Sequence, residues 1–235
     1  MKKLLIVQFR TDQSLAHEQQ CFREELVSEP VELYFMSAVA QEFPTELSAY
    51  DAVILGGSGE FMLGEGAGID TWRGPTFEFI DQLLEKNIPT LGICFGYQLI
   101  ALQQGAHIVN DEAMRETGTF DIFVNEQGKQ DPVFAAVPAV YAGQFAHKET
   151  IVNTPAHLTT LASTERVAVN AFRVQDKLMW GTLSHPELNR QRLIERLKLF
   201  PLYQNGKQFD EVIQEFRESA ENSLLLYNFV NIIKD

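Results

Sequence analysis

The sequence predicts an α/β fold, in which a doubly wound, mostly parallel sheet is flanked by helices and carries an antiparallel extension. Two observations predict it. Up to Gly105, short apolar runs alternate with helical patterns, as strands and crossover helices do in parallel sheets. After Gly105, strand-like runs follow one another with few helices between them. A length of 235 residues and a hydrophobic fraction of 45% suit one large globular domain.

The elements are expected in the following order. Up to Gly105, strands are predicted at 4–8, 31–35, 50–55 and 89–93, and helices at 17–27, 71–86 and 95–104. Further short strands are predicted at 107–109, 118–124, 140–145, 158–163, 166–173 and 177–183. The last of these is interpreted as a central strand that returns to the parallel part of the sheet. Helices are expected at about 188–199, 208–220 and 222–233, and the last is apolar enough to pack on the sheet.

Charge and cysteine content exclude several classes of function. The net charge of −13 argues against nucleic acid and against an anionic membrane as partners. No apolar run is long enough to span a membrane, and the short run at 4–7 is interpreted as the first strand, not as a signal peptide. Two cysteines make no disulfide framework, and we expect Cys21 to be a buried apolar side chain. A cytoplasmic location, where a free thiol stays reduced, is therefore expected.

The segment 89–101 predicts a nucleophile elbow, a tight turn between a strand and a helix that presents a reactive side chain. Cys94 takes the nucleophile position, and Gly92 and Gly96 flank it where larger side chains would collide. The following helix points its free N–H groups and positive dipole end at the sulfur. This arrangement favours the thiolate, which is the reactive form of cysteine.

His185 is the candidate base among the five histidines, because it follows the predicted strand 177–183 and can reach the end of a neighbouring strand. Glu187 lies two residues further on, and in extended backbone such residues point to the same side. Glu187 is therefore placed to hold one imidazole nitrogen while the other faces Cys94. The alternative is a structural histidine, which the cysteine elbow upstream disfavours.

Acyl transfer also requires donors for the developing oxyanion. The elbow supplies the N–H of Phe95, and the Gly56-Gly57 loop after a predicted strand is placed to supply a second. The alternative for these two glycines is a plain tight turn. Gln98 lies one helical turn beyond Cys94, where it is either a substrate contact or a residue of the helix surface.

Together these motifs resemble the class I glutamine amidotransferases, a family with a flavodoxin-like α/β fold. The matching motifs are Gly92-x-Cys94-x-Gly96-x-Gln98, Gly56-Gly57 and His185-Pro186-Glu187, within a resemblance that covers about residues 1–187. The similarity is greatest to the amidotransferase domain of GMP synthase and to stand-alone γ-glutamyl peptidases. It implies a single domain over 1–235 that uses no cofactor and no metal.

The resemblance also implies a mechanism. Cys94 would attack the side-chain amide of glutamine or of another γ-glutamyl compound, with His185 as acid and base and Glu187 as the group that orients His185. The N–H groups of Gly57 and Phe95 would stabilise the oxyanion. Substrate contacts would come from Gly56, Gln98, Ala146 and His147. The resulting thioester would be hydrolysed, and ammonia or an amine would be released.

Three stretches depart from the family pattern. Residues 58–60 read Ser-Gly-Glu, where the family often has proline. Residues 146–149 read Ala-His-Lys-Glu in place of the Ser-His-Gly-Asp of the GMP synthase type, which bears on glutamine specificity. His147 is either part of the pocket wall or an ordinary loop histidine. The segment 189–221 is longer than the usual ending and is expected to be a helical insertion that covers the site or binds a partner.

The resemblance leaves more than one function open. The sequence contains no synthetase domain and no P-loop, so a synthetase that receives ammonia would have to be a separate chain. A catalytically silent binding or regulatory protein could share the fold. A redox-sensing cysteine protein is a third alternative, although such a protein needs no His-Pro-Glu motif. No oligomeric state is predicted.

Overall fold

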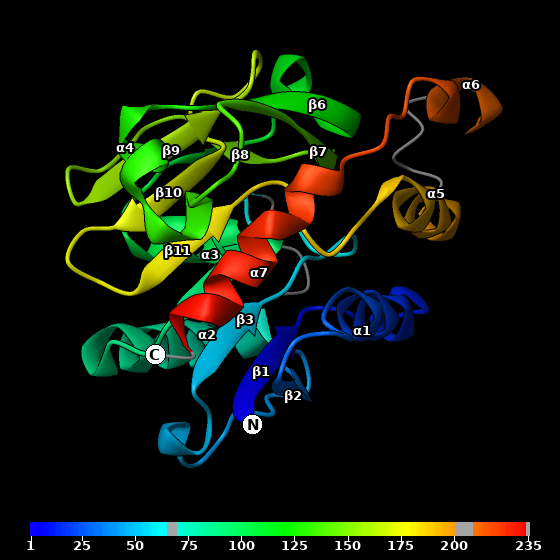
Figure 1. The fold of residues 1–235 in the computed structure, drawn as a ribbon. Helices are drawn as coiled ribbons and strands as arrows, with labels where there is room; N and C mark the ends of the chain where they lie inside the picture. The colour runs from blue at the N-terminus through cyan, green and yellow to red at the C-terminus, as the bar shows by residue number, and fades with distance from the viewer. Residues whose placement is uncertain (65–69, 201–208, 234–235) are drawn as a thin grey trace.

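The computed structural model describes residues 1–64, 70–200 and 209–233, and within them one sheet of nine strands runs through the molecule (Figure 1). Its strand order is β2-β1-β3-β4-β11-β10-β9-β6-β7. The first five strands of this order run parallel: β2 (Val31–Ser37), β1 (Lys2–Gln8), β3 (Ala52–Leu55), β4 (Thr90–Ile93) and β11 (Met179–Thr182). The predicted doubly wound, mostly parallel sheet is confirmed.

The other strands of this sheet form the predicted antiparallel extension. They are β10 (Ala171–Val174), β9 (Leu158–Ser163), β6 (Glu116–Val124) and β7 (Val140–His147). A small separate sheet pairs β5 (Ile108–Val109) with β8 (Thr150–Ile151). β11 joins the two halves, because it is parallel to β4 and antiparallel to β10. The prediction of a central strand that returns late in the sequence is therefore confirmed.

The helices of the described residues are α1 (Ser14–Glu25), α2 (Asp70–Lys86), α3 (Phe95–Gln103), α4 (Glu126–Gln130), α5 (Arg190–Leu199), α6 (Phe209–Gln214) and α7 (Leu224–Ile232). They lie on both faces of the sheet, except α6, which lies beyond α5 and away from the sheet in Figure 1. In Figure 1, α7 crosses in front of the sheet and α3 lies behind it. The Tyr227 hydroxyl of α7 donates to Glu25 of α1 at 2.6 Å, and α1 also packs beside α5. Over the described ranges, no helix has the length and apolar character needed to cross a bilayer.

The predicted strand at 166–173 is too long, because β10 begins only at Ala171. Thr164 closes a turn before it. Its hydroxyl accepts hydrogen bonds from the N–H groups of Arg166 at 3.2 Å and Val167 at 3.0 Å. A threonine that satisfies backbone donors in this way competes with the hydrogen bonds between strands. The residues before Ala171 therefore form a turn instead of extending β10.

The predicted helix at 208–220 is also too long, because α6 ends at Gln214. Phe216 then turns inward and packs on Gly118 of β6, where an added Cβ would lie 2.6 Å from the Phe216 ring. Burial of this ring to 5% exposure favours a break in the helix over its continuation. Residues 201–208 of the predicted insertion lie outside the described residues.

The connection from β4 to α3 passes at contact distance from β3. An added Cβ at Gly96 would lie 2.1 Å from the carbonyl oxygen of Leu55, and one at Gly92 would lie 2.7 Å from the backbone of Gly96. Only glycine fits at either position. The absence of these two side chains lets the helix that follows Cys94 begin directly against the neighbouring strand.

Replacing Gly96 by alanine is expected to destabilise the fold by about 3 kcal/mol or more, since the new methyl group would overlap the Leu55 carbonyl. Gly74→Ala in α2 is the matched control, because no heavy atom from outside its own stretch of helix lies within 4 Å of its added Cβ. That variant should stay within about 1 kcal/mol of the wild type, since the gain from replacing a helical glycine is opposed by Pro75, which disfavours a Cβ on the residue before it in helical backbone. Urea denaturation followed by circular dichroism measures both effects, and similar values for the two variants would contradict this account of the elbow.

Candidate active site

Cys94 stands at the turn between β4 and α3 in a backbone conformation that side chains rarely adopt. Its φ is 50° and its ψ is −97°. Strain of this kind persists only where the surroundings enforce it, and it is typical of functional sites. The side chain is buried, and the first N–H groups of α3 follow it directly. The chain thus holds the sulfur in a fixed position at the positive end of a helix.

His185 and Glu187 follow β11, the strand beside β4. The N–H of His185 donates to Gln144 O at 2.9 Å, and its carbonyl accepts from Asn222 Nδ2 at 2.7 Å. The ring atom Nδ1 lies 2.8 Å from Glu187 Oε1, and both side chains are almost fully buried. Backbone and ring are thus held from three sides, and Nε2 is the nitrogen left for Cys94.

The three strand ends bring Cys94, His185 and Gly57 together. An added Cβ at Gly57 would lie 2.9 Å from His185 Cε1 and 3.7 Å from Cys94 Cβ. Gly57 therefore lies beside both the thiol and the imidazole, and a larger residue would push into the ring. The loop after β3, the elbow after β4 and the turn after β11 meet at this point, as expected for the carboxyl edge of a parallel sheet.

Ionisation of the pair follows from its burial and its charges. Burial opposes the imidazolium, but the Glu187 carboxylate and the Cys94 sulfur outweigh it and raise the pKa of His185 to about 9. Burial also opposes ionisation of Glu187, but the facing imidazolium lowers the pKa of this carboxyl group to about 2. At neutral pH His185 is therefore protonated and can act as a proton donor.

The two N–H groups predicted to face an oxyanion differ from that of Gly56 in their hydrogen bonding. Over the described residues, neither the Gly57 N–H nor the Phe95 N–H donates to another backbone group. Gly56 differs, because its N–H donates to Val7 O at 2.9 Å and its carbonyl accepts from Gly96 N at 3.0 Å. Both backbone groups of Gly56 are thus used inside the protein, whereas the N–H groups of Gly57 and Phe95 make no backbone hydrogen bond in the described residues.

A small cavity beside Cys94 contains the other predicted substrate residues. Gln98, Ala146 and His147 line it, together with the loop at 58–62. The Gln98 amide donates to the carbonyl of Glu149 at 2.7 Å. His147 Nε2 lies 3.0 Å from Glu116 Oε2, in a fully buried pair. Both side chains therefore fix the far wall of the cavity through their own partners.

Sequence reasoning missed Arg10 as a residue that shapes the site, and it named Glu149 only as part of the altered stretch 146–149, without the role that the structure gives it. The Glu149 carboxylate accepts from the N–H groups of Leu63 at 2.7 Å and Gly64 at 2.8 Å, so it fixes the loop that follows Gly57. Arg10 bonds Glu18 Oε1 at 2.9 Å with both side chains buried. A usable signal existed for Arg10, because it lies two residues beyond β1 at the same sheet edge as the elbow.

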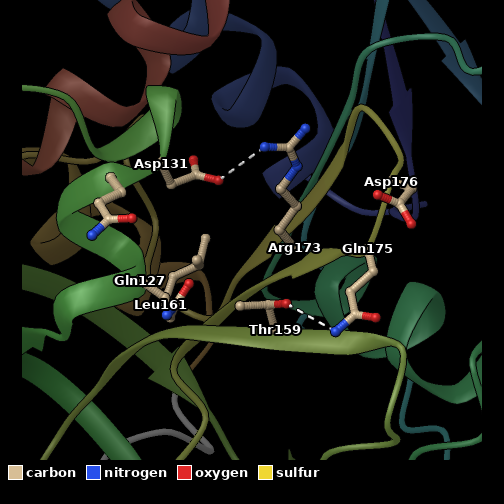
Figure 2. Close-up of a pocket in the computed structure, with 8 residues that line it drawn as sticks. Gln127, Asp131, Thr159, Leu161, Arg173, Gln175 and Asp176 are labelled. Atoms are coloured by element: carbon tan, nitrogen blue, oxygen red, sulfur yellow. Dashed lines mark hydrogen bonds and ion pairs between the residues drawn. The ribbon is translucent and has the colours of Figure 1, made fainter.

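A polar hollow at the other edge of the sheet is separate from this site (Figure 2). Its lining residues include Gln127, Asp131, Thr159, Leu161, Arg173, Gln175 and Asp176. Gln175 and Asp176 lie in the turn that leads into the start of β11, whereas His185 follows its end. In Figure 2 Arg173 pairs with Asp131 at 3.5 Å. Among the described residues, no cluster of side chains suited to a metal ion occurs here or elsewhere.

Comparison with known proteins shows which family and which relatives the chain is similar to. Residues 20–197 match the family model of class-I glutamine amidotransferases. A glutamine-hydrolyzing GMP synthase of Streptomyces avermitilis is 28% identical over 178 residues, which are 72% of this chain and 32% of that protein. One subunit of the glutamine-hydrolyzing GMP synthase of Methanococcus aeolicus is 32% identical over 110 residues, which are 47% of this chain and 56% of that protein. This chain thus matches only about a third to just over half of the length of these relatives.

A solved structure shows the same fold. A glutamine amidotransferase from Thermotoga maritima aligns with a TM-score of 0.79 at 19% sequence identity, over 100% of this chain and 99% of that chain. The alignment includes the parallel strands and the antiparallel extension, and it supports the predicted fold class.

The electrostatics of the site predict an unusual titration. In NMR spectra the His185 imidazole is expected to lose its proton near pH 9, and at a clearly lower pH in Glu187→Gln, where burial acts without the opposing carboxylate. Loss of the resonance in His185→Gln assigns it. Because the folded pKa is raised, this group stabilises the fold fully below about pH 6.5 and less as the pH rises through about 9. If the His185 imidazole titrates at the same pH in the wild type and in Glu187→Gln, the Glu187 carboxylate is not what raises its pKa.

Proposed function

The chain belongs to the class-I glutamine amidotransferase family, and we propose that Cys94, His185 and Glu187 are its catalytic residues. One observation carries the proposal. The Cys94 side chain and the His185 ring converge on Gly57, while Glu187 holds the far nitrogen of that ring. A nucleophile, a base and a carboxylate that orients the base are what covalent amide hydrolysis requires.

In the proposed reaction, Cys94 Sγ attacks the γ-carbonyl carbon of glutamine or of another γ-glutamyl compound. The N–H groups of Gly57 and Phe95 stabilise the oxyanion. His185 gives its proton to the leaving nitrogen as the C–N bond breaks, so ammonia or an amine departs and a γ-glutamyl thioester remains. His185 then takes a proton from water, which attacks the thioester and releases glutamate.

Substrate entry requires a rearrangement of the cavity walls. The cavity beside Cys94 measures about 20 Å³, which is room for about one water molecule. We place the glutamyl part of the substrate here, between the loop at 58–62 and the wall formed by Gln98, Ala146 and His147. Gly56 anchors the start of the loop through its backbone hydrogen bonds to Val7 and Gly96. The Glu149 carboxylate limits how far the far end of this loop can move, because it bonds two of its N–H groups.

We treat residues 1–235 as one amidotransferase domain in which 189–221 is an insertion over the site. The described part of this insertion supports that view, since Arg196, Leu197 and Phe200 of α5 and its end line a pocket beside His185. A separate synthetase chain as the receiver of ammonia is the second candidate. The observation that favours it is the Methanococcus aeolicus relative, whose name describes one subunit of a GMP synthase.

The purified protein is expected to release ammonia from glutamine and ethylamine from γ-glutamyl-ethylamide, with glutamate as the second product. Cys94→Ala should lower kcat by at least about 10⁴-fold, because it removes the nucleophile. A coupled assay for glutamate measures hydrolysis of either substrate, in the wild type and in the variant. Ammonia release that survives in Cys94→Ala would contradict the assignment, and a wild type inactive on every γ-glutamyl compound would favour a silent binding protein.

Cys21→Ala is the matched control for this experiment. The prediction that Cys21 is buried is confirmed, since its exposure is 1%. Burial raises the pKa of its thiol to about 12, so it stays protonated and unreactive at neutral pH. The variant should keep kcat within about twofold of the wild type.

A further inference from the structure

A second pocket lies on the His185 side of the site, between the oxyanion loop and α5. Its lining residues include Arg10, Ser58, Gly59, His185, Arg196 and Phe200. Ser58, Gly59 and Ala146 line both this pocket and the cavity beside Cys94, so the two spaces adjoin. Because His185 protonates the leaving nitrogen in the proposed reaction, this is the side on which the amine part of a γ-glutamyl substrate would lie. The pocket measures about 10 Å³, so, like the cavity beside Cys94, it must open to admit the substrate.

Arg196 brings an unsatisfied charge to this pocket. Its side chain is 3% exposed, and Nε donates to His17 Nδ1 at 2.9 Å. Nη1 and Nη2 are buried and have no hydrogen-bond partner in the described part of the chain. Leaving donors of a guanidinium buried and unpaired is costly, so a group that accepts from both would bind favourably here.

Arg10 adds a second guanidinium to the same pocket. Its Nε and Nη1 are occupied by Glu18 and by Ser14 Oγ, both at 2.9 Å. Nη2 lies beside Gly57, 3.2 Å from where a Cβ would stand. Burial lowers the pKa of Arg196, and the neighbouring charge of Arg10 lowers it further, as expected for two cations held close together. The nearby acid Glu18 already bonds Arg10 and Gln8.

The burial of Arg196 has one alternative explanation. Glu187 Oε2 is also buried without a partner in the described residues, so Arg196 could serve only as a countercharge for the catalytic carboxylate. The two groups do not bond, however, and Arg196 is a pocket-lining residue. A countercharge would affect every substrate equally, whereas a binding group would affect only substrates that reach it.

We propose that Arg196, with Arg10, binds a carboxylate on the amine part of the substrate, so that the enzyme prefers γ-glutamyl compounds of amino acids over γ-glutamyl compounds of uncharged amines. The inference rests on the proposed function and extends it to a substrate class. Arg is suited to the task, because its planar fork pairs with both oxygens of a carboxylate. During the reaction the C–N bond breaks, His185 supplies the proton, and the free amino acid leaves with its carboxylate.

The test compares γ-glutamyl-glycine with γ-glutamyl-ethylamide, which differ mainly in a carboxylate replacing a methyl group. We expect the wild type to show the higher kcat/KM with γ-glutamyl-glycine. Arg196→Gln should lower that value by about 10- to 100-fold, as loss of charge-assisted hydrogen bonds does, and should change kcat/KM for the ethylamide and for glutamine by less than about threefold. Lys198→Gln removes a charge from an exposed position of the same helix and should leave kcat/KM unchanged for all three substrates.

An equal loss on all three substrates would overturn the proposal in favour of the countercharge, as would a wild type that prefers the ethylamide. Arg196→Lys provides a second variant, with folding checked by thermal melting, and should keep only part of the preference because it lacks the fork. Calorimetric binding of γ-glutamyl-glycine to Cys94→Ala, with and without Arg196→Gln, tests the pocket without turnover. If binding depends on Arg196 but the wild type hydrolyses none of the three substrates, the anion pocket is kept and the proposed hydrolysis is refuted. If binding is the same with and without Arg196→Gln, the pocket is refuted.

Discussion

Two backbone hydrogen bonds made by the elbow hold the site together. The Cys94 N–H donates to Thr182 O at the end of β11, and the Gly96 N–H donates to Gly56 O after β3, at 2.9 and 3.0 Å. The elbow is therefore tied on one side to the strand that leads to His185 and on the other to the loop that carries Gly57. The strained φ of Cys94 and the glycines around it are what this three-way junction requires.

Charge is then built around that junction in closely matched pairs. Arg10 bonds Glu18, and His185 bonds Glu187, and all four side chains are almost completely buried. Buried pairs of this kind add little to stability, because desolvation offsets much of their attraction. In the proposed reaction the value of the His185–Glu187 pair is chemical, since the carboxylate keeps His185 protonated and in one orientation. Arg196 is the exception, a buried cation whose two terminal nitrogens have no partner in the described residues.

The parts of the site that could be predicted from sequence are those with a local pattern. The elbow around Cys94 is marked by its glycines, and His185 and Glu187 by their position after an apolar strand. Arg196 could not be found in this way. It lies in a helix rich in charged residues, where hydropathy indicates solvent. It is buried because α5 packs against α1, where Arg196 bonds His17, and because it lines the pocket beside Gly59. The boundaries that failed, at 166–170 and after Gln214, failed because a threonine turn and one buried phenylalanine overrode local propensity.

The central claim is that amide cleavage passes through a γ-glutamyl thioester on Cys94. Hydroxylamine tests it most directly, because it competes with water for a thioester after the amine has already left. With glutamine and γ-glutamyl-ethylamide as alternative donors, we expect the same ratio of γ-glutamyl hydroxamate to glutamate at each hydroxylamine concentration, since both donors give one intermediate. Different ratios for the two donors, or cleavage with no hydroxamate at any concentration, would contradict it.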